Sequence, residues 1–329
     1  MKNKRIEYIS LASVLSAIAV VFLHANVCAG EFSFASYWFS ANFIHSFFIF
    51  AVPLFFMISG AMLLDFNKKY NLKTYFSKRI TKTVIPYIFW SIFGILFQLF
   101  YLNAISHIDL IYIFNCLITG NAIDVYWFFI PLFELYVLFT VFVYIVNNKK
   151  HCLIFLVFLL GLNCVLNYFN IGVIVGYSFF AVFGFYVHKY GISRKLRIIF
   201  YVLAIFGFLA NSFGSYYLSI TAGRLIRTYI EYTFLPAMLY PCGLFVFIKY
   251  DLVKIMEHDC VNKIVSFLDF YTFGIYLIHW YILQIMIKLL NINIYSIIYR
   301  LGAPFVVIGI AVCIIYALRK IPLIKNIIP

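Results

Sequence analysis

The sequence contains few charged residues. Asp, Glu, Lys and Arg make up 11% of its 329 positions, whereas hydrophobic residues make up 65%. Soluble domains carry roughly 25% charged residues, so this chain cannot cover a surface that faces water. Acidic residues are especially scarce, and the formal net charge is +14. Because the basic residues form short clusters between apolar runs, they indicate membrane topology, and no nucleic-acid partner is predicted.

The sequence also lacks the motifs of several functional classes. It has no glycine-rich phosphate loop, nucleotide-binding fingerprint, internal repeat or low-complexity tract. Its closest cysteine pair, Cys152 and Cys164, has no second pair or histidine cluster that would complete a zinc site, so no metal is predicted. Cys28 and Cys116 are both expected on the outer side, which leaves a disulfide between them open.

Long apolar runs are the main feature of the sequence. A transmembrane helix needs about 20 apolar residues, and residues 108–118 are apolar but too short to span. The first run lacks a signal-peptide cleavage signature after Val27, so we expect it to be a retained helix. The pattern predicts an all-α, polytopic integral membrane bundle in a single domain, 1–329, with about ten transmembrane helices: 8–27, 44–64, 84–102, 125–146, 152–168, 171–187, 198–213, 229–248, 267–290 and 297–318.

The distribution of basic residues orients these helices. With the N-terminus inside, 21 of the 25 Lys and Arg residues fall in segments expected to be cytoplasmic. The outer side keeps only Arg224, Arg227, Lys288 and Arg300. This asymmetry is what the positive-inside rule predicts. We therefore expect both termini in the cytoplasm and a multi-pass protein of the plasma (inner) membrane.

Four ionisable residues within or near the predicted spans are candidates for function, because such groups are costly in a bilayer. His24 is expected near the outer face, at the end of the first helix. Glu134 is expected near the midplane of the fourth helix, and His279 about midway along the ninth. Glu231 is expected near the outer end of the eighth helix, where Arg224 and Arg227 are possible partners. Each of the four can alternatively be a packing residue.

The first helix carries a polar stripe on an otherwise apolar surface. At 100° per residue, Ser10 and Ser13 share the face of His24, within roughly 40° of it. Such a stripe is expected to point into the bundle or into a hydrated cavity. Because it shares a polar face with Ser10 and Ser13, His24 is a stronger candidate for a functional role than an isolated intramembrane histidine.

Five segments of the sequence form a recognisable series. They are AIAVVFLHA, in which the first helix ends at His24, AVPLFFMISG at 51–60, SKRITKTVIPYIFW at 77–90, YWFFIPLFELYVL at 126–138, and FGIYLIH at 273–279. The third of these is a basic loop that leads to a proline–aromatic helix. In this order and spacing the segments resemble acyltransferase family 3, whose members O-acetylate lipopolysaccharide, peptidoglycan and other glycans. The resemblance covers nearly the whole chain.

Four positions depart from the family pattern. Family members commonly have aspartate and arginine where Ser10 and Ser13 stand, arginine where Ile49 stands, and histidine where Val125 stands. The residues that match are His24, Arg79, Trp127 and His279. The charge network that would tune His24 is therefore expected to be incomplete.

The resemblance implies transfer of an acyl group, by default acetyl, from cytoplasmic acyl-CoA to a hydroxyl of a glycan or lipid-linked sugar. Acetyl-CoA is then a substrate, and no permanently bound cofactor is expected. His24 suits a general base or a transient acyl carrier. His279 is a second catalytic candidate, as a proton relay or a contact for the donor. The candidate donor-binding residues are Arg79, Lys78 and Lys82; the candidate acceptor-binding residues are Tyr126, Trp127 and Glu134.

Two other functions remain open. The first is a degenerate homologue that binds the donor or a glycan without turnover, which the changes at Ser10, Ser13, Ile49 and Val125 favour. The second is a transporter of a lipid-linked glycan, although such proteins tend to have internal repeats that this sequence lacks.

Overall fold

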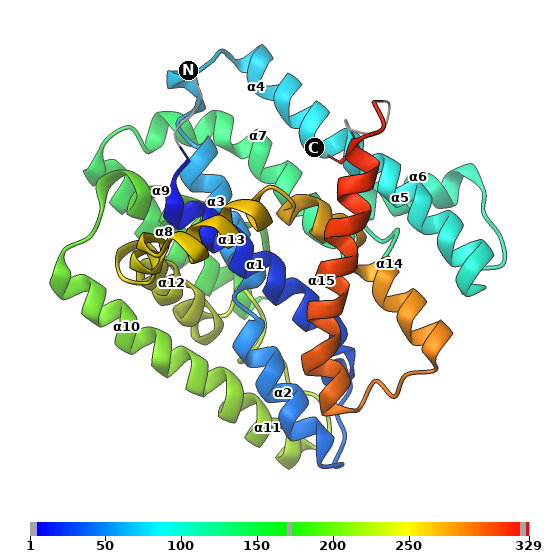
Figure 1. The fold of residues 1–329 in the computed structure, drawn as a ribbon. Helices are drawn as coiled ribbons and strands as arrows, with labels where there is room; N and C mark the ends of the chain where they lie inside the picture. Colours follow the sequence, from blue (N-terminus) through cyan, green and yellow to red (C-terminus); the bar gives the residue numbers. More distant parts are fainter. Residues whose placement is uncertain (1–4, 170–172, 323–326, 329) are drawn as a thin grey trace.

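The structure is a computed structural model that describes residues 5–169, 173–322 and 327–328. It is a helical bundle, 80% helical and without strands in the described residues (Figure 1). The α-helices are α1 (Glu7–Ala25), α2 (Tyr37–Phe48), α3 (Ala51–Leu63), α4 (Leu72–Arg79), α5 (Ile85–Phe97), α6 (Leu110–Thr119), α7 (Phe129–Ile145), α8 (Lys149–Tyr168), α9 (Val173–Tyr190), α10 (Arg194–Leu209), α11 (Ser215–Ala222), α12 (Leu235–Tyr250), α13 (Asp259–Asp269), α14 (Thr272–Leu290) and α15 (Ile297–Arg319).

The polytopic all-α prediction is confirmed. In the described residues, eight helical stretches are long and apolar enough to cross a membrane. The other two predicted spans are also helical, but α9 has 18 residues and α12 has 16, and neither is among the eight. The short run at 108–118 forms the ten-residue helix α6, as its length predicted.

Two predicted spans begin later than the apolar runs suggested. The run at 229–248 becomes helical only at Leu235, so Glu231 lies in the preceding turn and not at a helix end. The run at 267–290 is divided after α13, and α14 begins at Thr272. In both cases hydropathy detected the apolar stretch but could not detect the turn that interrupts it.

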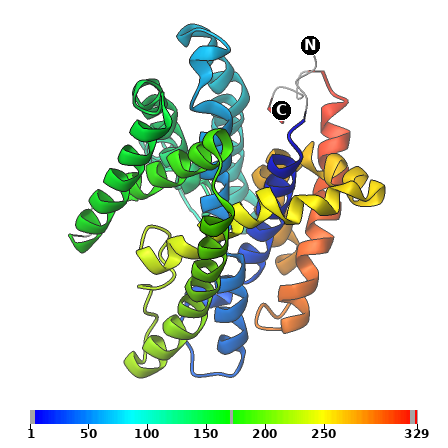
Figure 2. The ribbon, with the colours of Figure 1, turned by 90° about the vertical axis from the view of Figure 1, so that its left-hand side faces the viewer.

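Several helices turn apolar side chains outward, as a lipid environment requires. The spanning windows of α8 and of the stretch 194–222 are only 22% and 17% buried, whereas that of α1 is 67% buried. Figures 1 and 2 show α8, α10 and α15 on the outside of the bundle and α1 inside it. The exposed apolar side chains therefore form the lipid-facing surface, and the core surrounds α1.

The closest helix contact in the core joins α3 and α9. A Cβ atom on Gly60 would lie 1.8 Å from the backbone oxygen of Ala181, and one on Gly184 would lie 2.1 Å from that of Met57. Only glycine allows two backbones to approach this closely, which is how small residues pack membrane helices. The two contacts lie three residues apart on each helix and hold α3 against α9 over about one turn.

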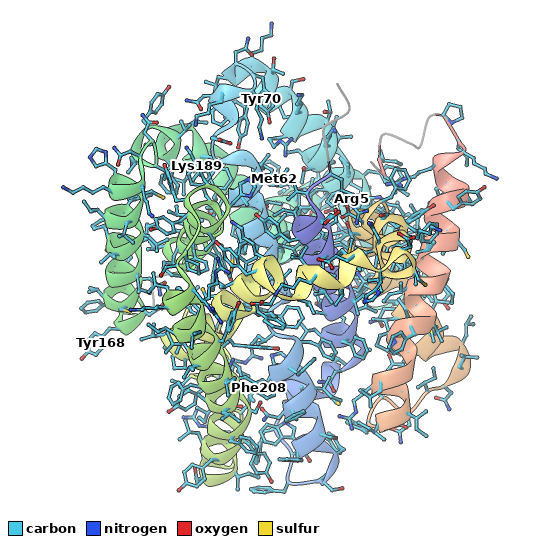
Figure 3. All side chains as sticks on the ribbon, turned by 60° about the vertical axis from the view of Figure 1, so that its left-hand side comes forward. Arg5, Met62, Tyr70, Tyr168, Lys189 and Phe208 are labelled. Carbon is cyan, nitrogen blue, oxygen red and sulfur yellow. The ribbon has the colours of Figure 1, made fainter. Side chains whose placement is uncertain are left out.

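Helix α13 runs across the bundle instead of along it (Figure 3). One of its ends contacts the start of α1, because Ser10 Oγ donates a hydrogen bond of 2.6 Å to Asp269 Oδ2. The start of α14 is consequently level with the second turn of α1. This offset brings the middle of α14 to the end of α1, where the first histidine lies.

Candidate active site

His24 and His279 form a direct pair in the centre of the bundle. His279 Nε2 lies 3.2 Å from His24 Nδ1, and the ring centroids are 5.0 Å apart. His279 is 0% exposed, whereas His24 is only partly buried. The sequence placed the two residues at different depths; the late start of α14 brings them together.

Backbone carbonyls determine the tautomer of each ring. His279 Nδ1 lies 2.7 Å from the Tyr276 oxygen, and His24 Nδ1 lies 2.8 Å from the Val20 oxygen. A carbonyl only accepts, so each Nδ1 carries a proton, and the single His24 Nδ1–H is shared between the Val20 oxygen at 2.8 Å and His279 Nε2 at 3.2 Å. His24 Nε2 is then left with a free lone pair, which is the requirement for a general base.

A cavity of about 350 Å³ lies on the side of the pair where α1 ends. Trp127 and Tyr232 stack in its wall with ring centroids 5.9 Å apart. His45, which interacts electrostatically with both His24 and Arg227, also lines it. We call this cavity the outer pocket; its remaining lining residues are Ala29, Gly30, Tyr177, Leu225, Arg227, Ile230 and Glu231.

A second cavity, of about 370 Å³, lies on the other side of the histidine pair. Lys82 and Thr83 reach it from η3, the π-helical segment Ile80–Val84 that continues from α4. Segments of π-helix often occur at functional sites. We call this cavity the inner pocket; its remaining lining residues are Ser13, Phe55, Ile58, Ser59, Phe128, Leu132, Tyr136, Thr272, Phe273 and Tyr276.

Aromatic side chains separate the two pockets. Trp127 lines the outer pocket, and the next residue, Phe128, lines the inner one. Phe128 packs on Phe56 at 4.9 Å between centroids, and Phe56 stacks on Tyr177 at 4.5 Å. These rings therefore block the passage of a ligand from one pocket to the other unless they move.

The predicted donor residues are only partly brought together. Lys82 lines the inner pocket, whereas Lys78 is exposed and lies over the Tyr70 ring, 4.2 Å from its centroid. Arg79 lies between them, 5.6 Å from the Tyr136 ring centroid. One turn of helix separates Lys78 from Lys82, and only the latter faces the cavity.

The predicted acceptor residues also differ in position. Trp127 is at the outer pocket, as expected. Tyr126 is not available for stacking on a sugar, because it is 0% exposed and its hydroxyl donates to the Leu277 oxygen. Glu134 lines neither pocket; it is exposed on α7, on the same face as Val137 and Val141. Glu134 was a candidate acceptor-binding residue, and it is absent from the lining of both pockets.

A charged pair surrounds Ser10 despite the missing family charges. Arg5 Nε donates to Ser10 Oγ at 2.8 Å, and Ser10 Oγ donates to Asp269 Oδ2 at 2.6 Å. Arg5 and Asp269 are themselves an ion pair at 3.8 Å. The acid and the base are thus present, but other segments supply them. No sequence motif indicates this arrangement, since it requires α13 to lie across α1.

Ionisable residues also lie near two other changed family positions, Ile49 and Val125. Ile49 is 2% exposed and Val125 is 1% exposed, so both are core residues. His45 is one turn before Ile49 in α2, and Asp124, next to Val125, interacts electrostatically with His24. Ionisable groups therefore lie at or next to three of the four changed positions, Ser10, Ile49 and Val125.

The fold and the site define a polytopic helical membrane protein with a buried histidine pair between two pockets. The family model described as an acyltransferase domain, that of acyltransferase family 3, matches residues 6–319. The chain belongs to this family. No curated protein and no solved structure matches it.

Proposed function

We propose that this protein is a membrane-bound O-acetyltransferase that moves an acetyl group from cytoplasmic acetyl-CoA to a hydroxyl of a cell-surface or lipid-linked glycan. The observation that carries the proposal is the contact between His24 and His279, because His24 lies in the chain between Ser13, which lines the inner pocket, and Ala29, which lines the outer pocket. A transferase with substrates on opposite sides of a membrane needs this arrangement. The family membership supports the acyl chemistry.

In the proposed reaction, His24 Nε2 takes the proton of the acceptor hydroxyl. The hydroxyl oxygen attacks the thioester carbonyl carbon, the C–S bond breaks, and His24 returns the proton to the sulfur of CoA. His279 stabilises the protonated ring of His24, because its Nε2 accepts from His24 Nδ1–H at 3.2 Å. A route through an acetyl group carried on His24 uses the same residues.

The inner pocket suits the donor. Lys82 is a cation at its wall, and the start of α1 and the end of α15 lie on the same side (Figure 2). With these ends in the cytoplasm, as the basic residues predict, the anionic part of acetyl-CoA would meet Lys82 and Arg79. The acetyl end would then extend past Phe55 and Tyr276 toward the histidine pair.

The outer pocket suits a sugar. The stacked Trp127 and Tyr232 present an aromatic wall, and Glu231 and His45 add hydrogen-bonding groups. A sugar ring offers an apolar face to such rings and hydroxyls to such polar groups. In the proposed orientation this pocket opens to the outside of the plasma membrane.

The alternative of a degenerate homologue rests on the four changed family positions. The ion pair at Ser10 and the histidine pair both favour an active enzyme instead. The two readings differ in one measurable respect: a degenerate protein would bind acetyl-CoA but transfer nothing.

The deciding experiment is mass spectrometry of surface glycans from cells that carry wild-type protein, His24→Ala, or a deletion of the gene. The expected result is loss of an acetyl mass increment in both mutants. An unchanged acetylation pattern in the deletion would exclude the proposed function. Binding of acetyl-CoA to purified wild-type protein without any acetyl increment in cells would favour the degenerate homologue.

A further inference from the structure

Arg300, in the first turn of α15, is a buried cation without an acidic partner. Its side chain belongs to a residue that is 1% exposed, and none of the ion pairs among the described residues involves it. A buried charge is costly unless other groups compensate for it. The hydrogen-bond partners of Arg300 show which groups compensate for its charge.

Every hydrogen-bond partner of Arg300 is neutral. One terminal nitrogen donates to Asn26 Oδ1 at 3.3 Å, and the other donates to Ser40 Oγ at 2.8 Å and to the Tyr295 oxygen at 3.2 Å. Its Nε has no hydrogen-bond partner among the residues that the structure describes. The guanidinium group therefore joins three separate segments of chain.

Two of these segments carry the histidines of the site. Asn26 follows α1 directly and is two residues beyond His24, while Ser40 is in α2, five residues before His45. Asn26 also donates through Nδ2 to the Ala41 oxygen at 2.7 Å. Arg300 and Asn26 thus fix the outer end of α1 against the start of α2.

The same contacts hold one wall of the outer pocket. The 3-10 turn η1 (Val27–Gly30) begins immediately after Asn26, and its Ala29 and Gly30 line that pocket. Cys28, in the middle of the turn, is 6% exposed, and its Sγ lies 3.9 Å from Asn26 Oδ1. If Arg300 is lost, Asn26 keeps its bond to the Ala41 oxygen, but its Oδ1 loses the guanidinium donor that ties the start of the turn to α15.

We propose that Arg300 is a positioning residue that holds His24, His45 and the η1 turn in register around the outer pocket. The part of this inference that concerns catalysis rests on the proposed function. Arginine suits the role because its planar fork donates to several acceptors in fixed directions, whereas lysine offers one compact ammonium group.

The first test measures the reactivity of Cys28 and needs no enzymatic activity. The full-length protein is purified in detergent with the exposed cysteines changed (Cys164→Ser, Cys260→Ser, Cys313→Ser), and a Cys28→Ser protein gives the background. A maleimide should label Cys28 about tenfold faster in Arg300→Met than in the parent protein, because lost charge-assisted hydrogen bonds release the turn. Arg300→Lys should give an intermediate rate.

Lys288→Met is the matched control, because Lys288 is another cation of the predicted outer side but donates only to the Tyr101 oxygen. Its labelling rate should equal that of the parent. Equal rates in Arg300→Met and the parent would overturn the proposal. If Arg300→Met does not fold, Ser40→Ala removes one of the same hydrogen bonds and is measured in its place, with the same two outcomes.

The second test separates positioning from general damage. In cells, surface acetylation should fall about tenfold in Arg300→Met at equal protein level, while the affinity of the purified variant for acetyl-CoA stays unchanged because the inner pocket is intact. Faster labelling of Cys28 with full acetylation would overturn the positioning role. Absence of acetylation in the wild type would instead contradict the proposed function, and the labelling result would still decide whether Arg300 holds the turn.

Discussion

The two pockets have similar volumes and are separated by the same aromatic side chains, but the chemistry of their lining residues differs. The inner pocket has one cation, Lys82, among mostly apolar and hydroxyl side chains. The outer pocket combines His45, Arg227 and Glu231 with the stacked Trp127 and Tyr232. Two unlike pockets on either side of one histidine pair suit two unlike substrates. A channel that carries one substrate across the membrane would need similar walls along its whole length.

The largest effect should come from His24→Ala, which removes the proposed general base. We expect acetylation of surface glycans to fall about a thousandfold, within the usual contribution of a general base. Acetyl-CoA binding by the purified variant should be retained, since no donor contact is lost. A variant that keeps most of its acetylation would contradict the central role of His24.

Trp127→Ala should affect the outer pocket alone. We expect surface acetylation to fall about tenfold, because the aromatic contact with the sugar ring should contribute on the order of 1 kcal/mol. Trp127→Phe should recover most of the loss, since it keeps an aromatic ring. The affinity of both purified Trp127 variants for acetyl-CoA should be unchanged. A weaker affinity for acetyl-CoA would contradict the assignment of the donor and the acceptor to separate pockets.

Lys82→Ala should affect the inner pocket alone. We expect acetyl-CoA affinity to fall about fivefold, as for one partly solvated charge-assisted hydrogen bond. The control is Lys78→Ala, four residues away, whose side chain lies over Tyr70 outside the pocket. Equal losses in the two variants would indicate a general effect of positive charge instead of a contact in the pocket.

Ser10→Asp should lower the thermal unfolding midpoint by about 5 °C, although it restores a common family residue. The new carboxylate would stand against Asp269, which already occupies that place, and like charges at this distance repel each other. The double change Ser10→Asp with Asp269→Ser should recover the midpoint. No recovery would mean that Asp269 does not substitute for the missing charge.

The smallest effect is expected outside both pockets, at Asp251. Hydrogen bonds from Lys254 and Tyr201 lower the pKa of this carboxyl group. A lowered pKa stabilises the folded state at pH values above the ordinary carboxyl range, and this contribution disappears as the pH falls through the folded-state value. Asp251→Asn should therefore lower the unfolding midpoint by about 1 °C at pH 7 and by nothing in strong acid, without changing acetylation.

The sequence was sufficient for the class of fold and for some of the site. All eight helical stretches that are long and apolar enough to span, among the described residues, coincide with predicted apolar runs, and the position of His24 at the end of α1 was correct. The sequence could not reveal that His279 contacts His24, because that contact depends on the turn before Thr272. His45 was missed for a related reason: a histidine within an aromatic helix has no periodic signal, and only the packing of α2 beside α1 turns it toward the pocket.

The charged residues near Ser10 show a second limit. Motif comparison reads one position at a time, so it registered the loss of an aspartate and an arginine. Arg5 and Asp269 restore both charges from elsewhere in the chain. A substitution of this kind is visible only in three dimensions.

The close contact between α3 and α9 restricts how substrates can enter. Gly60 and Gly184 leave no space for even a methyl group at the crossing. The two helices therefore cannot slide past each other, and we expect them to move together as one rigid body. Phe55 and Ser59 of α3 belong to the inner pocket, and Tyr177 of α9 belongs to the outer one. Both pockets thus share a fixed wall, and any gate must lie on the opposite side, among α1, α14 and the turn before α7.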